Sequence, residues 1–216
     1  MKILVLGEHN ENEIQQATLC VVDAAKKLGG EIDIMLTTNA SDKVVNQAST
    51  IDSVSKVLHF SNERFQNIVG EDVAECALSI SDDYDFFLTS SSTTGKNILP
   101  RIAAKLDIQQ ISEIIEIIDP KTFKKPIYAG SCIATVSTSQ EKNALTIRTT
   151  SFDKAELGSG SAVVETKNCP NFSSRRTDFV KNELTVSDRP ELTAADIIVS
   201  GGRGTVSYTH LTLPTI

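Results

Sequence analysis

Residues 1–36 read MKILVLGEHNENEIQQATLCVVDAAKKLGGEIDIML, and this stretch decides the fold. Lys2–Leu6 is a continuous apolar run, which is typical of a buried strand. A segment of helical periodicity follows, ends at Gly29-Gly30 and precedes a second apolar run, Ile32–Leu36. The helical apolar positions are Ile14, Ala17, Val21, Ala25 and Leu28. The order strand, helix, strand predicts a βαβ unit with parallel strands.

The alternation continues to Leu106. Further strands are predicted at Lys56–Phe60 and Phe86–Thr89, and further helices at Ser41–Thr50, Phe65–Ser79 and from about Gly95 to Leu106. We therefore predict an α/β fold, with a mainly parallel, Rossmann-like sheet covered by helices on both faces.

The pattern of apolar and polar residues changes after Leu106. QISEIIEIID (110–119) fits a strand or a helix, because the run is short and β-branched. KPIYAGSCIATVSTS (125–139) and NALTIRTT (143–150) are rich in Ile, Val and Thr, and a polar turn separates them. This pattern predicts antiparallel strands added to the sheet. GSGSAVVETK (158–167) adds one more short strand.

Composition shifts define the expected domains. Residues 1–166 form the N-terminal α/β domain, and the polar, Pro- and Arg-containing residues 167–193 form an extended linker or docking arm. Residues 194–204 begin a second domain with a strand and a glycine-rich turn. Residues 205–216 form a tail.

The length, composition and net charge of the chain exclude several classes of protein. A chain of 216 residues with 40% hydrophobic residues can bury a substantial core. The net charge of −7 argues against nucleic-acid binding, which needs a basic surface. No apolar run approaches the length of a membrane span. The four cysteines are scattered, so we interpret them as buried thiols rather than as a metal site or disulfide framework, and we predict no metal ligands.

The polar residues after the first strand are the first candidates for chemistry. Glu8 and His9 follow the first strand, at the edge where ligand crevices form, but only Gly7 of a dinucleotide fingerprint is present. We interpret them as packing or surface residues. His59, His210 and the paired carboxylates (Asp82 with Asp83, Glu11 with Glu13) have no nucleophile context, so no catalytic residue is predicted.

SSSTTGKN (90–97) resembles a P-loop only in part. The pattern requires a glycine where Ser90 stands and a Ser or Thr where Asn97 stands. The missing hydroxyl would remove the usual Mg²⁺ ligand. We interpret the Ser/Thr residues as capping the helix that begins near Gly95.

SGGRG (200–204) is the remaining candidate site. It follows the apolar run Asp196–Val199, and its glycines permit close approach of the backbone to a ligand. The guanidinium of Arg203 offers a planar pair of donors to a phosphate. The alternative is an ordinary tight turn with an exposed arginine.

Four stretches carry a family resemblance: PRIAAKLDIQQISEIIEI (100–117), KPIYAGSCIATVST (125–138), LTIRTTSFDKAELGSGSAVVE (145–165) and SDRPELTAADIIVSGGRG (187–204). They resemble the electron transfer flavoprotein α subunit, from Met1 to Gly204. The resemblance implies a C-terminal flavodoxin-like domain that holds FAD. It also implies a partner β subunit that carries AMP.

The resemblance implies an electron carrier rather than an enzyme. The family takes electrons from acyl-CoA and other dehydrogenases and delivers them to a membrane quinone oxidoreductase, in fatty acid β-oxidation. By position, Arg203 matches the family's FAD-contacting arginine, with Gly201, Gly202 and Gly204 shaping the turn. Other flavin contacts are expected beyond this chain, so we expect little FAD affinity and mainly subunit docking from the chain alone.

The last residues depart from the family. TVSYTHLTLPTI (205–216) has no helical stripe and resembles translated sequencing adapter, so we expect a foreign tail after a truncated α subunit. Two alternatives remain open at this point. One is a nucleotide-binding protein of the universal-stress type, and the other is a paralogous carrier of the nitrogen-fixation or carnitine-linked branch. We expect a bacterial cytoplasmic protein, or alternatively one of the mitochondrial matrix.

Overall fold

The computed structural model describes residues 1–39, 42–173, 175, 177, 179–181 and 197–201. Contacts along the chain divide it into two units, Met1–Phe179 and Val180–Ile216. The helices and strands that can be described all belong to the first unit.

A parallel sheet forms the centre of the first unit. Its strands in the described part of the chain lie in the order β10-β3-β2-β1-β4-β9-β5, and every neighbouring pair is parallel. They are β1 (Lys2–Leu6), β2 (Glu31–Thr38), β3 (Lys56–Ser61), β4 (Phe86–Ser90), β5 (Gln110–Ile114), β9 (Asn143–Ile147) and β10 (Val163–Lys167). The predicted mainly parallel α/β class is confirmed.

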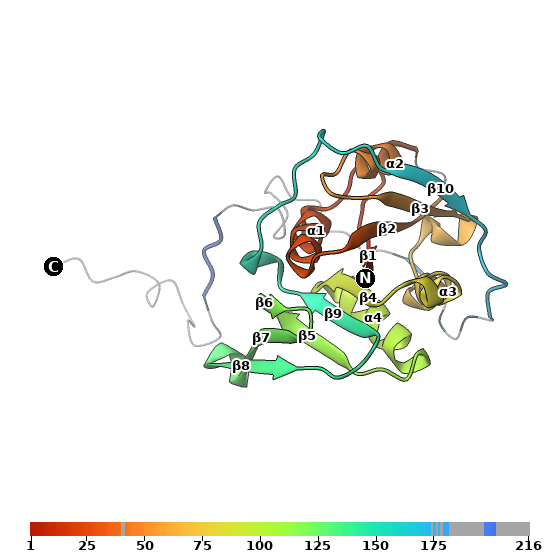
Figure 1. Cartoon of the computed structure of the whole chain (residues 1–216). Coiled ribbons are helices and arrows are strands. Elements are labelled where there is room, and N and C mark those ends of the chain that lie inside the picture. The colour runs from red at the N-terminus through yellow and green to blue at the C-terminus, as the bar shows by residue number, and fades with distance from the viewer. Residues whose placement is uncertain (40–41, 174, 176, 178, 182–196, 202–216) are drawn as a thin grey trace. The chain divides into compact units, whose positions relative to one another are not determined.

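Helices cover both faces of this sheet (Figure 1). The helices are α1 (Gln16–Leu28), α2 (Asp42–Ser49), α3 (Gly70–Ser79) and α4 (Thr93–Lys105), with short 3₁₀ turns η1 (Glu63–Gln66), η2 (Ser81–Asp83), η3 (Tyr128–Gly130) and η4 (Thr149–Ser151). Alternate residues of β1 serve the two faces, as the two-residue period of a strand requires. Ile3 and Val5 pack in the cluster that contains α1 and α2, and Leu4 and Leu6 pack in the one that contains α3 and α4.

A second, antiparallel sheet follows β5. It contains β6 (Glu116–Asp119), β7 (Thr122–Ile127) and β8 (Cys132–Ser137) in that order. Its fully buried Phe123 joins the core cluster on the α1 face, together with half-buried Ile117 and Val136. This sheet therefore packs on the rest of the first unit through the apolar side that carries Phe123.

The antiparallel strands predicted after Leu106 form, but the prediction that they extend the main sheet was wrong. β7 and β8 pair in the separate sheet rather than extending the main one, and β9 lies inside the main sheet, parallel to β4 and β5. All five residues of β9 are buried. Composition alone does not separate a buried parallel strand from an antiparallel one, since both favour β-branched residues.

Three other expectations differ in detail. The predicted helix Phe65–Ser79 divides into η1 and α3. QISEIIEIID forms β5 and β6, and β5 itself carries a positive φ of 60° at Glu113 and a register shift against β9 between Ile111 and Ile114. The four cysteines are free, but only Cys20 and Cys76 are buried. Cys132 is exposed and Cys169 is half-buried, so the prediction of buried thiols was wrong for these two.

Candidate functional site

A crevice lies at the point where the strand order reverses. β1 has β2 on one side and β4 on the other, and ligands of open α/β sheets bind outside the carboxyl ends of such strands. A pocket of about 310 Å³ opens there. Its lining includes Gly7, Glu8, His9, Thr37, Thr89, Thr93 and Asn97.

Glu8 is the charged group at the centre of this crevice. Its carboxylate accepts hydrogen bonds from the hydroxyls of Ser90 and Ser92, the latter at 2.8 Å to both oxygens. Its backbone is fixed by α1, because the Thr18 hydroxyl accepts from the Glu8 N–H at 2.8 Å and donates to the Glu8 carbonyl at 2.9 Å. The backbone of Glu8 is therefore held by the start of α1, and its carboxylate by the end of β4 and the N-cap of α4.

Ser92 links Glu8 to α4. Its Oγ donates to the carboxylate of Glu8 and accepts from the backbone N–H of Gly95 at 2.9 Å, which makes it the N-cap of α4. The predicted Ser/Thr capping is confirmed, with the helix starting at Thr93. Gly95 is required here for space: a Cβ on this residue would lie 2.1 Å from the carbonyl oxygen of Ser90.

The histidines of the first unit contact neutral oxygen atoms. His9 places Nδ1 2.8 Å from the Asn10 carbonyl and Nε2 3.0 Å from the Thr37 carbonyl. His59 is buried, with Nε2 2.8 Å from the hydroxyl of Thr38. Burial lowers the pKa of His59 from its usual 6.5. The interpretation of His9 as a packing or surface residue agrees with these contacts.

The crevice fits an anionic phosphate poorly. A phosphate in this kind of fold binds at a helix N-terminus, where backbone N–H groups converge. At α4 the N-cap hydroxyl is already engaged by Glu8, and a second anion beside this carboxylate would be repelled. The hydroxyl of Ser92 accepts from this helix N-terminus, and the carboxylate of Glu8 accepts from that hydroxyl.

The other candidate groups of the first unit lie in solvent. Glu11, Glu13, Asp82 and Asp83 are exposed, as predicted. Over the described ranges, no cluster of three or more His, Cys, Asp or Glu side chains is arranged to hold a metal ion. No helix that can be described there is both long and apolar enough to cross a membrane.

The predicted flavin residues belong to the second unit. Gly202, Arg203 and Gly204 lie outside the described residues, as does His210, and Gly201 is exposed. In the part of this unit that is described, Ile197–Gly201 form neither helix nor strand. The side chains of Ile197 and Val199 are 85% and 94% exposed.

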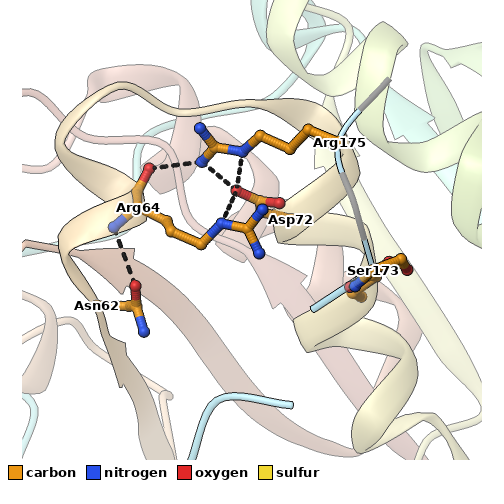
Figure 2. Close-up of polar contacts among 6 residues, drawn as sticks. Asn62, Arg64, Asp72, Ser173 and Arg175 are labelled. Atoms are coloured by element: carbon orange, nitrogen blue, oxygen red, sulfur yellow. Dashed lines mark hydrogen bonds and ion pairs between the residues drawn. The ribbon is translucent and has the colours of Figure 1, made fainter. Parts of the chain in front are cut away.

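A polar cluster on α3 was not predicted from the sequence (Figure 2). Asp72 is only 2% exposed and accepts from Nε of Arg175 at 2.9 Å and from Nη2 of the same side chain. Nε of Arg64 lies 3.5 Å from the same carboxylate oxygen. The available signal was an acidic residue among apolar helix positions and an arginine in the predicted docking arm. Neither identified the other as its partner.

Comparison with known proteins now defines the class. Residues 3–170 match the electron transfer flavoprotein domain, so the chain belongs to that family. It is 46% identical over 204 residues to the electron transfer flavoprotein subunit alpha of Pseudomonas aeruginosa, covering 94% of this chain and 66% of that protein. The corresponding subunit of Paracoccus denitrificans is 35% identical over 206 residues, with the same coverage of 94% and 66%.

A mitochondrial relative is similar. The probable mitochondrial subunit alpha of Caenorhabditis elegans is 35% identical over 203 residues, which cover 93% of this chain and 61% of that protein. The chain spans 61 to 66% of the length of these curated relatives.

Proposed function

We propose that this chain is part of the α subunit of an FAD-dependent electron carrier that works as an α/β heterodimer. The observation that carries the proposal is the family match over residues 3–170, with a named α subunit 46% identical. The intact protein takes electrons from acyl-CoA and other dehydrogenases and passes them to a quinone oxidoreductase, as in fatty acid β-oxidation. It turns over no organic substrate of its own.

FAD, when bound, supplies the redox chemistry, and the protein supplies its binding and electrostatic tuning. Arg203 is the residue of this chain proposed to contact FAD, within the turn of Gly201, Gly202 and Gly204. The exposure of Ile197–Val199 supports a larger domain around this turn, because an apolar run of this kind is normally buried between neighbouring parallel strands. AMP is proposed to belong to the β subunit.

The β7–β8 hairpin is the proposed docking element for the β subunit. At its end Tyr128 is 80% exposed and Ile133 is 62% exposed. Tyr128 and Ala129 both have positive φ angles, of 51° and 54°, which is a strained backbone for residues with a Cβ. Exposed apolar side chains on a strained turn are characteristic of a binding surface.

Co-expression with the β subunit of the same source tests both parts of the proposal. We expect the two chains to co-purify, and we expect substoichiometric flavin absorbance, since one arginine cannot enclose FAD. An Ile133→Asp variant should lose the β subunit. Val163→Asp is the matched control, because Val163 on β10 is equally exposed (61%). Failure of the wild-type chains to associate, or loss of association only in the control, would contradict the docking proposal.

Nucleotide binding by the first unit is the second candidate, favoured only by the crevice beside β1 and β4. Isothermal titration of the chain with ATP and AMP tests it, and the position of Glu8 leads us to expect no binding. A paralogous carrier of the nitrogen-fixation or carnitine-linked branch shares the same fold, and genomic neighbours would distinguish it. We propose a bacterial cytoplasmic location, with the mitochondrial matrix as the alternative, because both bacterial and mitochondrial proteins are among the relatives.

A further inference from the structure

The chain that leaves β10 runs along one face of α3. Asp72, Glu75 and Cys76 lie three and four residues apart, so they share that face. Each contacts one of residues 169–173 and 175, which we call the strap. Ser173, for example, donates its backbone N–H to Glu75 Oε2 at 3.0 Å and its hydroxyl to Oε1.

The strongest contact of the strap is the one drawn in Figure 2. Arg175 directs Nε and Nη2 to one oxygen of Asp72 and donates from Nη2 to the backbone carbonyl of Arg64 at 3.0 Å. The Arg175 side chain is 20% exposed and that of Asp72 2% exposed. Water therefore screens this ion pair less than a surface pair.

Apolar contacts extend the same face. The ring of Phe172 packs edge-on against buried Phe65, with 5.9 Å between the ring centres, and the guanidinium of Arg64 lies 4.7 Å above Phe172. The thiol of Cys169 lies beside that of buried Cys76 and donates to the backbone carbonyl of Ser61 at 3.6 Å. The described residues of the strap thus contribute an aromatic ring, a thiol, a hydroxyl and a cation to one continuous contact.

Asp72 has two arginine partners of different origin. Arg64 belongs to η1, within the α/β unit, whereas Arg175 arrives from beyond the last strand. A buried carboxylate that loses its only cation is strongly destabilising. Because Arg64 stays beside Asp72, the strap can separate from α3 without leaving that charge uncompensated.

We propose that this face of α3 is a docking site for the chain's own linker, with the strap as its occupant and the Asp72–Arg175 pair as its charged centre. The rest of the chain is then tethered at Arg175 rather than at Lys167, where β10 ends. Docking removes the eight residues 168–175 from the free linker. At full extension this shortens its reach by roughly 26–29 Å.

Site-resolved thiol labelling of the 216-residue chain tests this docking site. Iodoacetamide is added under native conditions, and each cysteine peptide is followed by mass spectrometry. Cys169 reports on the strap, buried Cys20 on α1 reports on unfolding of the unit, and exposed Cys132 calibrates the reagent. Burial raises the pKa of the Cys20 and Cys169 thiols, so both react slowly in the wild type.

The variants remove each side of the ion pair separately. Asp72→Asn and Arg175→Gln should each raise the labelling rate of Cys169 about tenfold or more, because a charge-assisted hydrogen bond contributes at least that factor. Arg175→Lys keeps the charge but loses the two-donor geometry, so its rate should be intermediate. Arg148→Gln removes an exposed arginine at the end of β9 and should change nothing.

The labelling of Cys20 separates docking from folding. The proposal requires the Cys20 rate to stay within about twofold of wild type while Cys169 accelerates. It is overturned if neither Asp72→Asn nor Arg175→Gln accelerates Cys169. Equal acceleration of Cys20 and Cys169 in Arg175→Gln also overturns it, since the contact would then serve the fold of the whole unit. The measurement needs neither FAD nor a β subunit, so its result is independent of the proposed electron-carrier function.

Discussion

Two carboxylates of the first unit, Glu8 and Asp72, both serve the beginning of a helix and are held in different ways. Glu8 orients the N-cap of α4 and receives neutral hydroxyl donors, whereas Asp72 lies in the first turn of α3 and receives two guanidinium groups. Both have partners distant in sequence: Ser92 is 84 residues from Glu8, and Arg175 is 103 residues from Asp72.

The difference lies in what positions the partner. Ser90 belongs to β4, which pairs with β1, so the contact to Glu8 follows from strand pairing. Arg175 comes after the last described strand, and its side chain is joined to Asp72 and to the Arg64 carbonyl. We infer that the crevice is an integral part of the folded sheet and that the strap is a separable attachment. Four predictions test this contrast, from the largest expected effect to the smallest.

Closing the space at Gly95 should have the largest effect. In Gly95→Ala the new Cβ would meet the Ser90 carbonyl oxygen at 2.1 Å, so the start of α4 must move away from β4. We expect a loss of about 3 kcal/mol in the free energy of unfolding, measured by urea denaturation. Thr94→Ala, an exposed neighbour, is the control and should cost far less. Equal stability of the two variants would show that α4 is not held against β4 as described.

Removing the carboxylate of Glu8 from the crevice should have the second largest effect on stability. Glu8→Ala leaves the hydroxyls of Ser90 and Ser92 without their acceptor, and we expect a cost of about 1–3 kcal/mol in unfolding free energy. Glu8→Gln should cost less, because its amide oxygen still accepts. The control is Glu156→Ala, at an exposed position. If Glu8→Ala is no more destabilising than this control, the crevice is not stabilised by its own anion.

Salt should affect the contacts of the strap and leave those of the crevice unchanged, and this effect should be smaller than the first two. Raising NaCl from 0.05 to 1 M shortens the Debye length to about 3 Å, which weakens ion pairs but leaves hydroxyl–carboxylate bonds largely unchanged. We expect Cys169 labelling to rise about two- to threefold relative to Cys132, since the pair is only partly screened. The cost of Glu8→Ala should be the same at both concentrations. A Cys169 rate independent of salt would argue against an electrostatic strap.

The smallest effect should be the pH dependence of the unfolding free energy that comes from His59. Like Glu8, His59 is held by a neutral partner, the hydroxyl of Thr38. Burial lowers the pKa of His59 below 6.5. The charge of His9 also lowers this pKa, and the charge of Asp42 raises it. The unfolded chain therefore binds the proton more tightly, so His59's contribution is complete above pH 6.5 and is lost as the pH falls through the folded-state value.

Urea denaturation between pH 7.5 and 5.5 measures this dependence, and one proton limits its slope to about 1.4 kcal/mol per pH unit. His59→Gln should lose less stability on acidification than the wild type. A wild type and His59→Gln with parallel pH profiles would refute the assignment.

Sequence periodicity predicted the first unit well up to Leu106, because buried strands and amphipathic helices alternate there with clear periods. It also predicted the capping of α4 and the solvent exposure of Asp82 and Asp83. It failed at β7, β8 and β9, because strand composition reports burial but not the identity of the neighbouring strand. The Arg175–Asp72 pair was missed for a related reason, since no local pattern relates two side chains 103 residues apart.

The sequence by itself determined the α/β class and, through its resemblance, the family, since both depend on local periods and on residue identities in short stretches. Only the tertiary structure decided which strands are neighbours, that the Glu8 carboxylate meets the N-cap hydroxyl of α4, and that the strap lies on α3. Those three facts depend on which distant segments meet, and that is decided by the packing of the whole unit.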